Sequence, residues 1–171
     1  MKKVLIASLM LISCAAFSQV AIGKASVSNT AVSLEFGSQE ARGIVLPYVT
    51  NAAAVSPVEG SIIFDSNDKK VKFFNGSWKD LTMLTNGTVD LAPQNALIEN
   101  TAAKATVGTP TNTDGILVLE DTNKAMILPK VTNPHTAIKS PAAGMMVYDN
   151  TKKLLCIFNG TEWTYWKPEN Y

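Results

Sequence analysis

A cysteine and a histidine are the first residues in this sequence that could do chemistry together, because an imidazole can activate a thiol as a nucleophile. His135 is the only histidine, and Cys156 is the only cysteine after the first eighteen residues. Cys156, however, aligns with Lys72 in an internal repeat, which indicates a solvated surface position. His135 falls in a loop insertion that has no counterpart in the other copy. We therefore predict no catalytic residue and no enzymatic activity.

The acidic segment 65–68 has some features of a calcium loop, which needs oxygen ligands at its positions 1, 3 and 5, a glycine at 6 and a glutamate at 12. Asp65 and Asn67 supply the first two ligands, but Lys69 and Lys70 stand at the fifth and sixth positions. A hairpin turn rich in turn-forming residues explains the segment. We predict no bound metal and no cofactor.

Three Asn-Gly-Ser/Thr triplets begin at Asn75, Asn86 and Asn159. They fit the pattern of a glycosylation acceptor, but Asn-Gly also supplies the positive φ angles of tight turns. We interpret all three as turns.

Aromatic residues gather near the end of each copy of the repeat. Trp78 and Trp163 occupy equivalent positions and are predicted to pack in the core, since a unit of about 60 residues needs large side chains to fold. Tyr165 and Trp166 have no aromatic counterpart in the first copy. Exposed rings of this kind can stack on a sugar or on a partner protein, so we name them as candidate ligand-stacking residues.

Composition narrows the function classes. The 171 residues include 15 Lys and Arg against 14 Asp and Glu, which gives a formal net charge of +1. This charge leaves no positive surplus for neutralising a phosphate backbone, so we predict that nucleic acid is not a partner.

Residues 1–18 have the form of a secretory signal peptide. Lys2 and Lys3 precede an uncharged apolar stretch, and Ala-Phe-Ser at 16–18 forms a small-x-small cleavage site before Gln19. The segment Leu-Ile-Ser-Cys ending at Cys14 also fits a lipobox, in which Cys14 is lipidated and becomes the new N-terminus. The sequence therefore predicts a secreted or cell-surface protein, with an outer-membrane lipoprotein as the alternative.

The rest of the chain contains two copies of one repeat unit. LPYVTN at 46–51 matches LPKVTN at 128–133, SPVEGSIIFD at 56–65 matches SPAAGMMVYD at 140–149, and FNGSW ending at Trp78 matches FNGTEW ending at Trp163. The two copies span residues 22–81 and 107–166, separated by a linker at 82–106 and followed by a tail at 167–171.

Each copy reads as a small antiparallel meander. In the first copy β-branched and aromatic runs at 61–65 and 71–74 are joined by a polar turn, and an Asn-Gly turn precedes Trp78. The second copy repeats this order at 145–149, 154–158 and Trp163. Further strands are predicted at 31–36 and 115–119, and a short helix at 94–104.

These motifs, LPxVT followed by SPxxGxxxYD and NGxW, resemble those of secreted surface proteins of the Bacteroidota with tail-fibre-like β repeats. The resemblance covers both copies and implies a β-rich, oligomeric, surface-exposed protein without catalytic residues.

We therefore predict an all-β fold with two tandem copies of a small antiparallel meander unit. Intertwining of these units in a homo-oligomer such as a trimer is a further expectation. The predicted function is that of a secreted or cell-surface structural or adhesion-type protein, and the alternative is a module that binds a surface glycan or a surface protein. The residues shared by both copies are predicted to be structural: Pro47, Gly60, Asp65, Trp78, Pro129, Gly144, Asp149 and Trp163.

Overall fold

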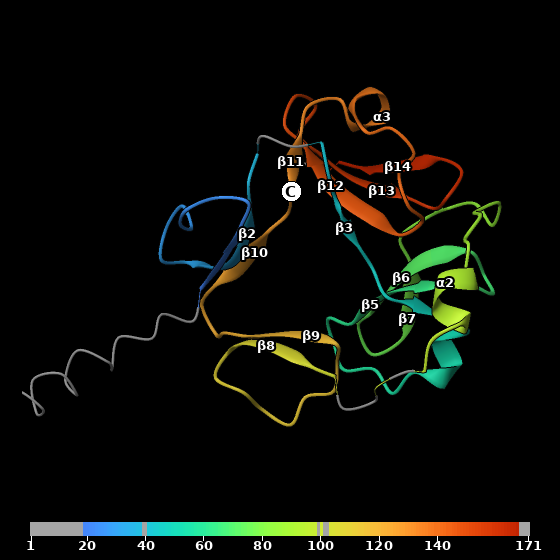
Figure 1. Cartoon of the computed structure of the whole chain (residues 1–171), viewed down its shortest axis with the longest axis horizontal. Coiled ribbons are helices and arrows are strands. Elements are labelled where there is room, and N and C mark those ends of the chain that lie inside the picture. Colours follow the sequence, from blue (N-terminus) through green and yellow to red (C-terminus); the bar gives the residue numbers. More distant parts are fainter. Residues whose placement is uncertain (1–18, 39–40, 99, 101–102, 168–171) are drawn as a thin grey trace, which may run out of the picture.

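The computed structural model describes residues 19–38, 41–98, 100 and 103–167. The predicted signal peptide, Cys14 and residues 168–171 lie outside the described residues. Strands make up nearly all of the regular structure, so the fold is all-β as predicted (Figure 1). The strands in chain order are β1 (Val20–Ile22), β2 (Val32–Phe36), β3 (Ile44–Val45), β4 (Tyr48–Val49), β5 (Ile62–Asp65), β6 (Lys70–Phe74), β7 (Trp78–Asp80), β8 (Ala105–Gly108), β9 (Leu117–Glu120), β10 (Ala125–Ile127), β11 (Lys130–Val131), β12 (Met145–Asp149), β13 (Leu154–Phe158) and β14 (Trp163–Trp166).

Both halves of the chain carry the same succession of strand pairings. A parallel pair comes first, β1 with β2 and β8 with β9. A short parallel strand then flanks the meander, β4 beside β5 and β11 beside β12. The antiparallel meanders β5–β6–β7 and β12–β13–β14 follow. The structural correspondence therefore extends beyond the predicted meanders to the parallel pairs.

The prolines and glycines that both copies share have equivalent backbone roles in the two halves. The Pro47 carbonyl accepts the Phe64 amide at 3.0 Å, and the Pro129 carbonyl accepts the Tyr148 amide at 2.9 Å. Gly60 and Gly144 begin the two meanders at φ angles of 89° and 72°. These angles lie in the left-handed region that side chains with a Cβ rarely adopt, which explains why glycine stands at both positions.

The two halves also exchange strands. β10 of the second half lies parallel to β2 of the first, with Met126 opposite Leu34. β3 of the first half pairs antiparallel with β12 of the second, with Val45 opposite Met145. In Figure 1 both strands run between the sheets, β3 in cyan and β10 in orange. One sheet of each half therefore takes a strand from the other half, whereas β4-β5-β6-β7 and β8-β9 are each formed within one half.

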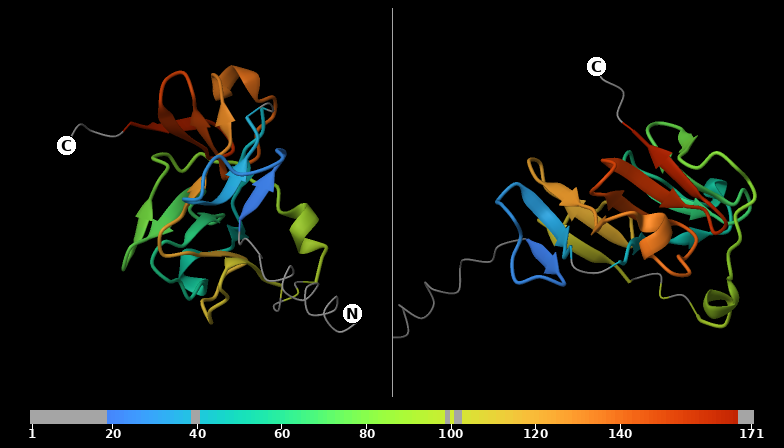
Figure 2. Two further views of the ribbon diagram at one scale, coloured as in Figure 1. Left: turned by 90° about the vertical axis from the view of Figure 1, so that its left-hand side faces the viewer. Right: turned by 90° about the horizontal axis from the view of Figure 1, so that it is seen from above.

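The main core lies between the two meanders and draws on both. Phe64 and Val71 from the first half pack with Met146 and Ile157 from the second. The Tyr48 hydroxyl donates to the Ala143 carbonyl at 2.8 Å across the same boundary. Figure 2 shows the two meanders packed together when the molecule is seen from above. The repeats are therefore halves of one folding unit.

The helix predicted at 94–104 is wrong in its extent. Helix α2 covers only Ala92–Asn95, and β8 already begins at Ala105. Leu97 and Ile98, which lie within the predicted helix, are exposed and pack on no core. The other described helices are η1 (Ala52–Ala54) and α3 (Pro134–Ala137). Among the described residues no helix has the length and apolar character needed to span a bilayer.

Candidate functional site

A buried carboxylate closes the first turn of each meander. Asp65 and Asp149, the last residues of β5 and β12, are almost completely inaccessible to solvent. Asp65 Oδ1 accepts the amides of Asn67 and Asp68, both at 3.0 Å. Asp149 Oδ1 likewise accepts the amides two and three residues further on, at 2.8 and 3.1 Å. Both carboxylates thus close their turns by accepting two backbone amides each.

The second oxygen of the two carboxylates differs between the halves. Asp65 Oδ2 accepts the Ala52 amide at 2.9 Å. The residue equivalent to Ala52 is Pro134, which has no amide hydrogen, and Asp149 Oδ2 has no hydrogen-bond partner among the described residues. Burial opposes ionisation of Asp149, but the amides of Lys152, Thr151 and Asn133 outweigh it and keep the pKa of Asp149 below its usual value.

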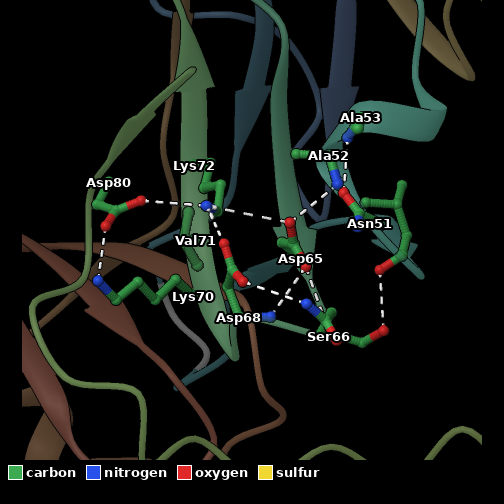
Figure 3. A network of polar contacts seen from close by, with 12 residues as sticks. Asn51, Ala52, Ala53, Asp65, Ser66, Asp68, Lys70, Val71, Lys72 and Asp80 are labelled. Carbon is green, nitrogen blue, oxygen red and sulfur yellow. Dashed lines mark hydrogen bonds and ion pairs between the residues drawn. The ribbon is translucent and has the colours of Figure 1, made fainter.

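A lysine lies among three carboxylates on the first meander (Figure 3). Lys72 Nζ is 4.0 Å from Asp65, 3.4 Å from Asp80 and in direct contact with Asp68. Burial would lower the pKa of Lys72, but Asp68 and Asp80 outweigh burial and raise it. Asp80 is also paired with Lys70 at 2.6 Å, so two lysines and the backbone amides of the turn neutralise the three carboxylates.

The second meander replaces this charged cluster with an apolar one. Cys156 stands where the first half has Lys72, and its cross-strand partner is Tyr165 where the first half has Asp80. Cys156 packs with Val131, Ile138 and Val147. The prediction that Cys156 is a surface residue is wrong, and so is its premise, since the Lys72 side chain is only 12% exposed. The charge of Lys72 is tolerated because carboxylates surround it.

The surroundings of Cys156 disfavour ionisation of its thiol. Burial, followed by the nearby charge of Asp149, raises the pKa of the Cys156 thiol to about 11. A thiol with this pKa is protonated at neutral pH and is a poor nucleophile. His135 is exposed in α3. Among the residues that the structure describes, no group of three or more His, Cys, Asp or Glu is arranged to hold a metal ion.

Replacing Cys156 by serine is expected to cost about 1 to 3 kcal/mol of unfolding free energy, because it puts a hydroxyl into an apolar cluster. Urea denaturation followed by circular dichroism measures the effect. His135→Ala is the control and should stay within about 0.5 kcal/mol, as for an ordinary surface site. Equal stability of both variants and the parent would contradict the packing role of Cys156.

Two of the three Asn-Gly-Ser/Thr triplets pack against each other. Asn159 is fully buried, and its Nδ2 donates to Asn86 Oδ1 at 2.8 Å. Thr161 Oγ1 donates to the Asn86 carbonyl at 2.8 Å. A Cβ at Gly160 would come within 1.9 Å of the Thr88 carbonyl oxygen, so only glycine permits this approach. The triplets at 86 and 159 therefore attach the linker to the second meander.

An equivalent aromatic pair stands at the second turn of each meander. The ring centroids of Phe74 and Trp78 are 5.3 Å apart, and those of Phe158 and Trp163 are 5.2 Å apart. Both tryptophans are half-buried. Trp163 also packs on the apolar cluster around Cys156. The pair thus has different support in the two halves.

The candidate stacking residues lie on β14, at the edge of their sheet. Tyr165 and Trp166 are both exposed. Trp166 Nε1 donates to the Leu81 carbonyl at 2.7 Å, which fixes one edge of the indole on the first half. Their outer surfaces remain open to solvent.

A polar hollow of about 520 Å³ lies beside β2. Glu35 in its wall accepts the Ser28 amide at 2.6 Å and pairs with Lys24 Nζ at 2.6 Å. Hydrogen bonds from Lys24 and Ser28 lower the pKa of Glu35 to about 2. Glu35, the only acid among the described residues of the wall, is therefore ionised and already paired.

Sequence comparison adds one finding to this geometry. Residues 106–170 match a family model described as "Phage tail like trimerisation region". The matched segment starts in β8 and contains β9, β10, β11 and the whole second meander. No curated protein and no solved structure matches the chain. The second half of this chain is thus similar to a region through which three copies of a chain associate.

Proposed function

We propose that this chain is the subunit of a homotrimeric, tail-fibre-like structural protein at the cell surface. The observation that carries the proposal is the match of residues 106–170 to a trimerisation region. Its support in the structure is the exposure of large apolar side chains within that segment, namely Ile116, Leu117, Met126, Tyr165 and Trp166. Association of three copies would cover exposed apolar side chains of this size.

Multi-angle light scattering on the purified chain tests the trimer directly. The expected mass is that of three chains, each of 18.3 kDa if unprocessed. Dilution should shift the mass towards a single chain only well below the working concentration. A mass of one chain at every concentration would overturn the proposal.

Export is the second part of the proposal and rests on residues 1–18, which carry the features of a signal peptide. N-terminal mass spectrometry of the extracellular chain should find Gln19 as the first residue. A lipidated Cys14 as the first residue would instead indicate an outer-membrane lipoprotein. A chain that stays in the cytoplasm with Met1 intact would contradict both.

Recognition of a surface glycan or surface protein is a second candidate function, and one observation favours it. Tyr165 and Trp166 present exposed rings on adjacent positions of an edge strand. Aromatic rings exposed in this way can stack on sugars or anchor a protein contact. An adhesive tip carried by a trimeric structural protein would combine the two functions.

A further inference from the structure

The strand pair β8–β9 lacks the third strand that its counterpart in the first half has. Its counterpart in the first half, β1–β2, is extended by β10 to a three-stranded parallel sheet. β9 pairs only with β8 among the described residues. One edge of β9 is therefore open where the matching edge of β2 is covered.

Burial follows this difference residue by residue. The four residues 32–35 of β2 are each only 1 to 3% exposed. Leu117, the equivalent of Val32, is 47% exposed, and Ile116 just before it is 64% exposed. The strand in the second half is also the more apolar, with Leu-Val-Leu-Glu in place of Val-Ser-Leu-Glu. β9 therefore has the composition of a buried strand, but no neighbouring strand lies along its second edge.

Only the last residue of β9, Glu120, is charged, and the apolar residues before it leave the rest of this edge unguarded. Monomeric proteins guard open edges with lysine, proline, a bulge or a covering loop. Residues 115–119 of this chain read Gly-Ile-Leu-Val-Leu and contain no charge and no proline. An apolar, unguarded edge of this kind is suited to pairing with another strand.

The duplication identifies the strand that would cover it. β10 pairs with the outer edge of β2. The first-half equivalent of β10 is β3, which begins directly after Gly43. Within its own chain β3 pairs only with β12 among the described residues, so its other edge is open. Val45 on this strand is 45% exposed. Figure 1 shows β9 and β3 in separate parts of the molecule, with β9 in the lower part, just above β8.

We infer that the open edge of β9 is a docking site for the β3 strand of a second copy of this chain. The inference rests on the proposed homotrimer and assigns its contact surface. The register follows from β2 and β10, where Met126 lies opposite Leu34 and Ile127 opposite Glu35. Ile44 of one copy is then opposite Leu119 of the next, and Val45 is opposite Glu120.

This contact joins two different surfaces, β9 of one copy and β3 of the next, so it is head-to-tail. Head-to-tail contacts either close into a ring or continue as a filament. Closure after three copies, the number proposed above, leaves every β9 edge covered and uses every β3 strand.

Disulfide trapping tests the register in the full chain. In Val45→Cys/Glu120→Cys the new thiols belong to neighbouring positions of the proposed parallel pair, within the reach of a disulfide. Oxidation should give covalent dimers and trimers that reduction separates, while the buried Cys156 stays unreacted. Val45→Cys/Ile98→Cys is the matched control, since Ile98 is fully exposed and lies on no strand; it should give no ladder.

A charge on the open strand tests the contact without a new bond. Leu117→Lys should raise the concentration at which the trimer dissociates by about 100-fold, because it places a charge in an apolar contact. Ile98→Lys should leave the mass unchanged. Circular dichroism and the melting temperature of diluted samples establish that both variants fold; if Leu117→Lys does not fold, the disulfide ladder decides alone.

The outcomes separate the two proposals. A trimeric parent with a disulfide ladder and a weakened Leu117→Lys trimer supports the assignment of β9. A trimeric parent with no ladder overturns the docking site but leaves the homotrimer standing, as does a folded Leu117→Lys variant with an unchanged trimer. A parent that is monomeric at every concentration overturns the homotrimer and the docking site together.

Discussion

Replacing Asp65 by alanine is expected to cost about 3 to 5 kcal/mol of unfolding free energy, and replacing Asp149 by alanine about 2 to 3 kcal/mol. Both carboxylates are buried and hold two amides of the following turn. Hydrogen bonds to charged groups contribute about 1.5 to 3 kcal/mol each before losses are shared. Asp65 additionally holds the Ala52 amide and lies 4.0 Å from Lys72, so its loss removes more.

Asparagine at the same positions is the sharper comparison. Asp65→Asn would turn an amide nitrogen towards the Ala52 amide or towards the turn, so that two donors face each other. Asp149→Asn can place its nitrogen where Asp149 Oδ2 accepts no bond. Asp149→Asn should therefore cost less than Asp65→Asn in urea denaturation. The reverse order would contradict the assigned role of Ala52 and Pro134 in distinguishing the two turns.

Trp163→Ala is expected to lower the unfolding free energy by about 3 kcal/mol, near the lower end of the range for emptying a large aromatic site. Trp163 contacts Phe158 and also packs on the cluster around the buried Cys156. Trp78→Ala should cost less, about 1 to 2 kcal/mol, because Trp78 and its partner Phe74 are both partly open to solvent. Thermal and urea unfolding of the two variants measures the difference.

Trp166→Ala is the contrasting variant, because its ring is exposed and its one described hydrogen bond goes to the Leu81 carbonyl. A loss of about 1 kcal/mol is expected from that bond. A glycan array or a cell-surface binding assay with the same variant examines the recognition function. Lost binding with a nearly unchanged melting temperature would favour recognition, whereas unchanged binding would remove Trp166 from the candidate ligand-stacking residues.

Unchanged melting temperatures in both Trp163→Ala and Trp78→Ala would contradict the structural role of these two tryptophans.

The meanders could be predicted from sequence because their signals are local. The runs at 145–149 and 154–158 became β12 and β13 with the predicted limits, and the Asn-Gly pairs at 75 and 159 lie between strands as expected. The prediction of a turn at Asn86 is wrong, because Gly87 does not have a positive φ and the segment packs against Asn159 instead. Alternation of side chains and turn residues fixes such hairpins within a few residues of chain. The same argument succeeded twice because the unit is duplicated.

The parallel pairs and the exchange of strands were missed because they depend on contacts between distant residues. β10 and β3 have two or three residues each, too few for any periodicity to show. Cys156 was misplaced for a related reason: the alignment with Lys72 was correct, but the burial of Lys72 among Asp65, Asp68 and Asp80 cannot be seen in one dimension. Comparing the apolar content of residues 32–35 and 117–120 would have flagged β9 as unusual.

The exchange of strands also determines when each half can fold during synthesis of the chain. β2 acquires its outer neighbour β10 only from residues 125–127, and the Asn86 segment finds its partner only at Asn159. When the ribosome has completed the first repeat, β10 and the segment around Asn159, which complete the contacts of the first half and the linker, have not yet been synthesised. Pairings between residues so far apart in sequence form slowly, because a long loop must close first. An early-terminated chain ending in the linker would carry an exposed β2 edge, so truncation should be met by aggregation or proteolysis instead of by a folded half-protein.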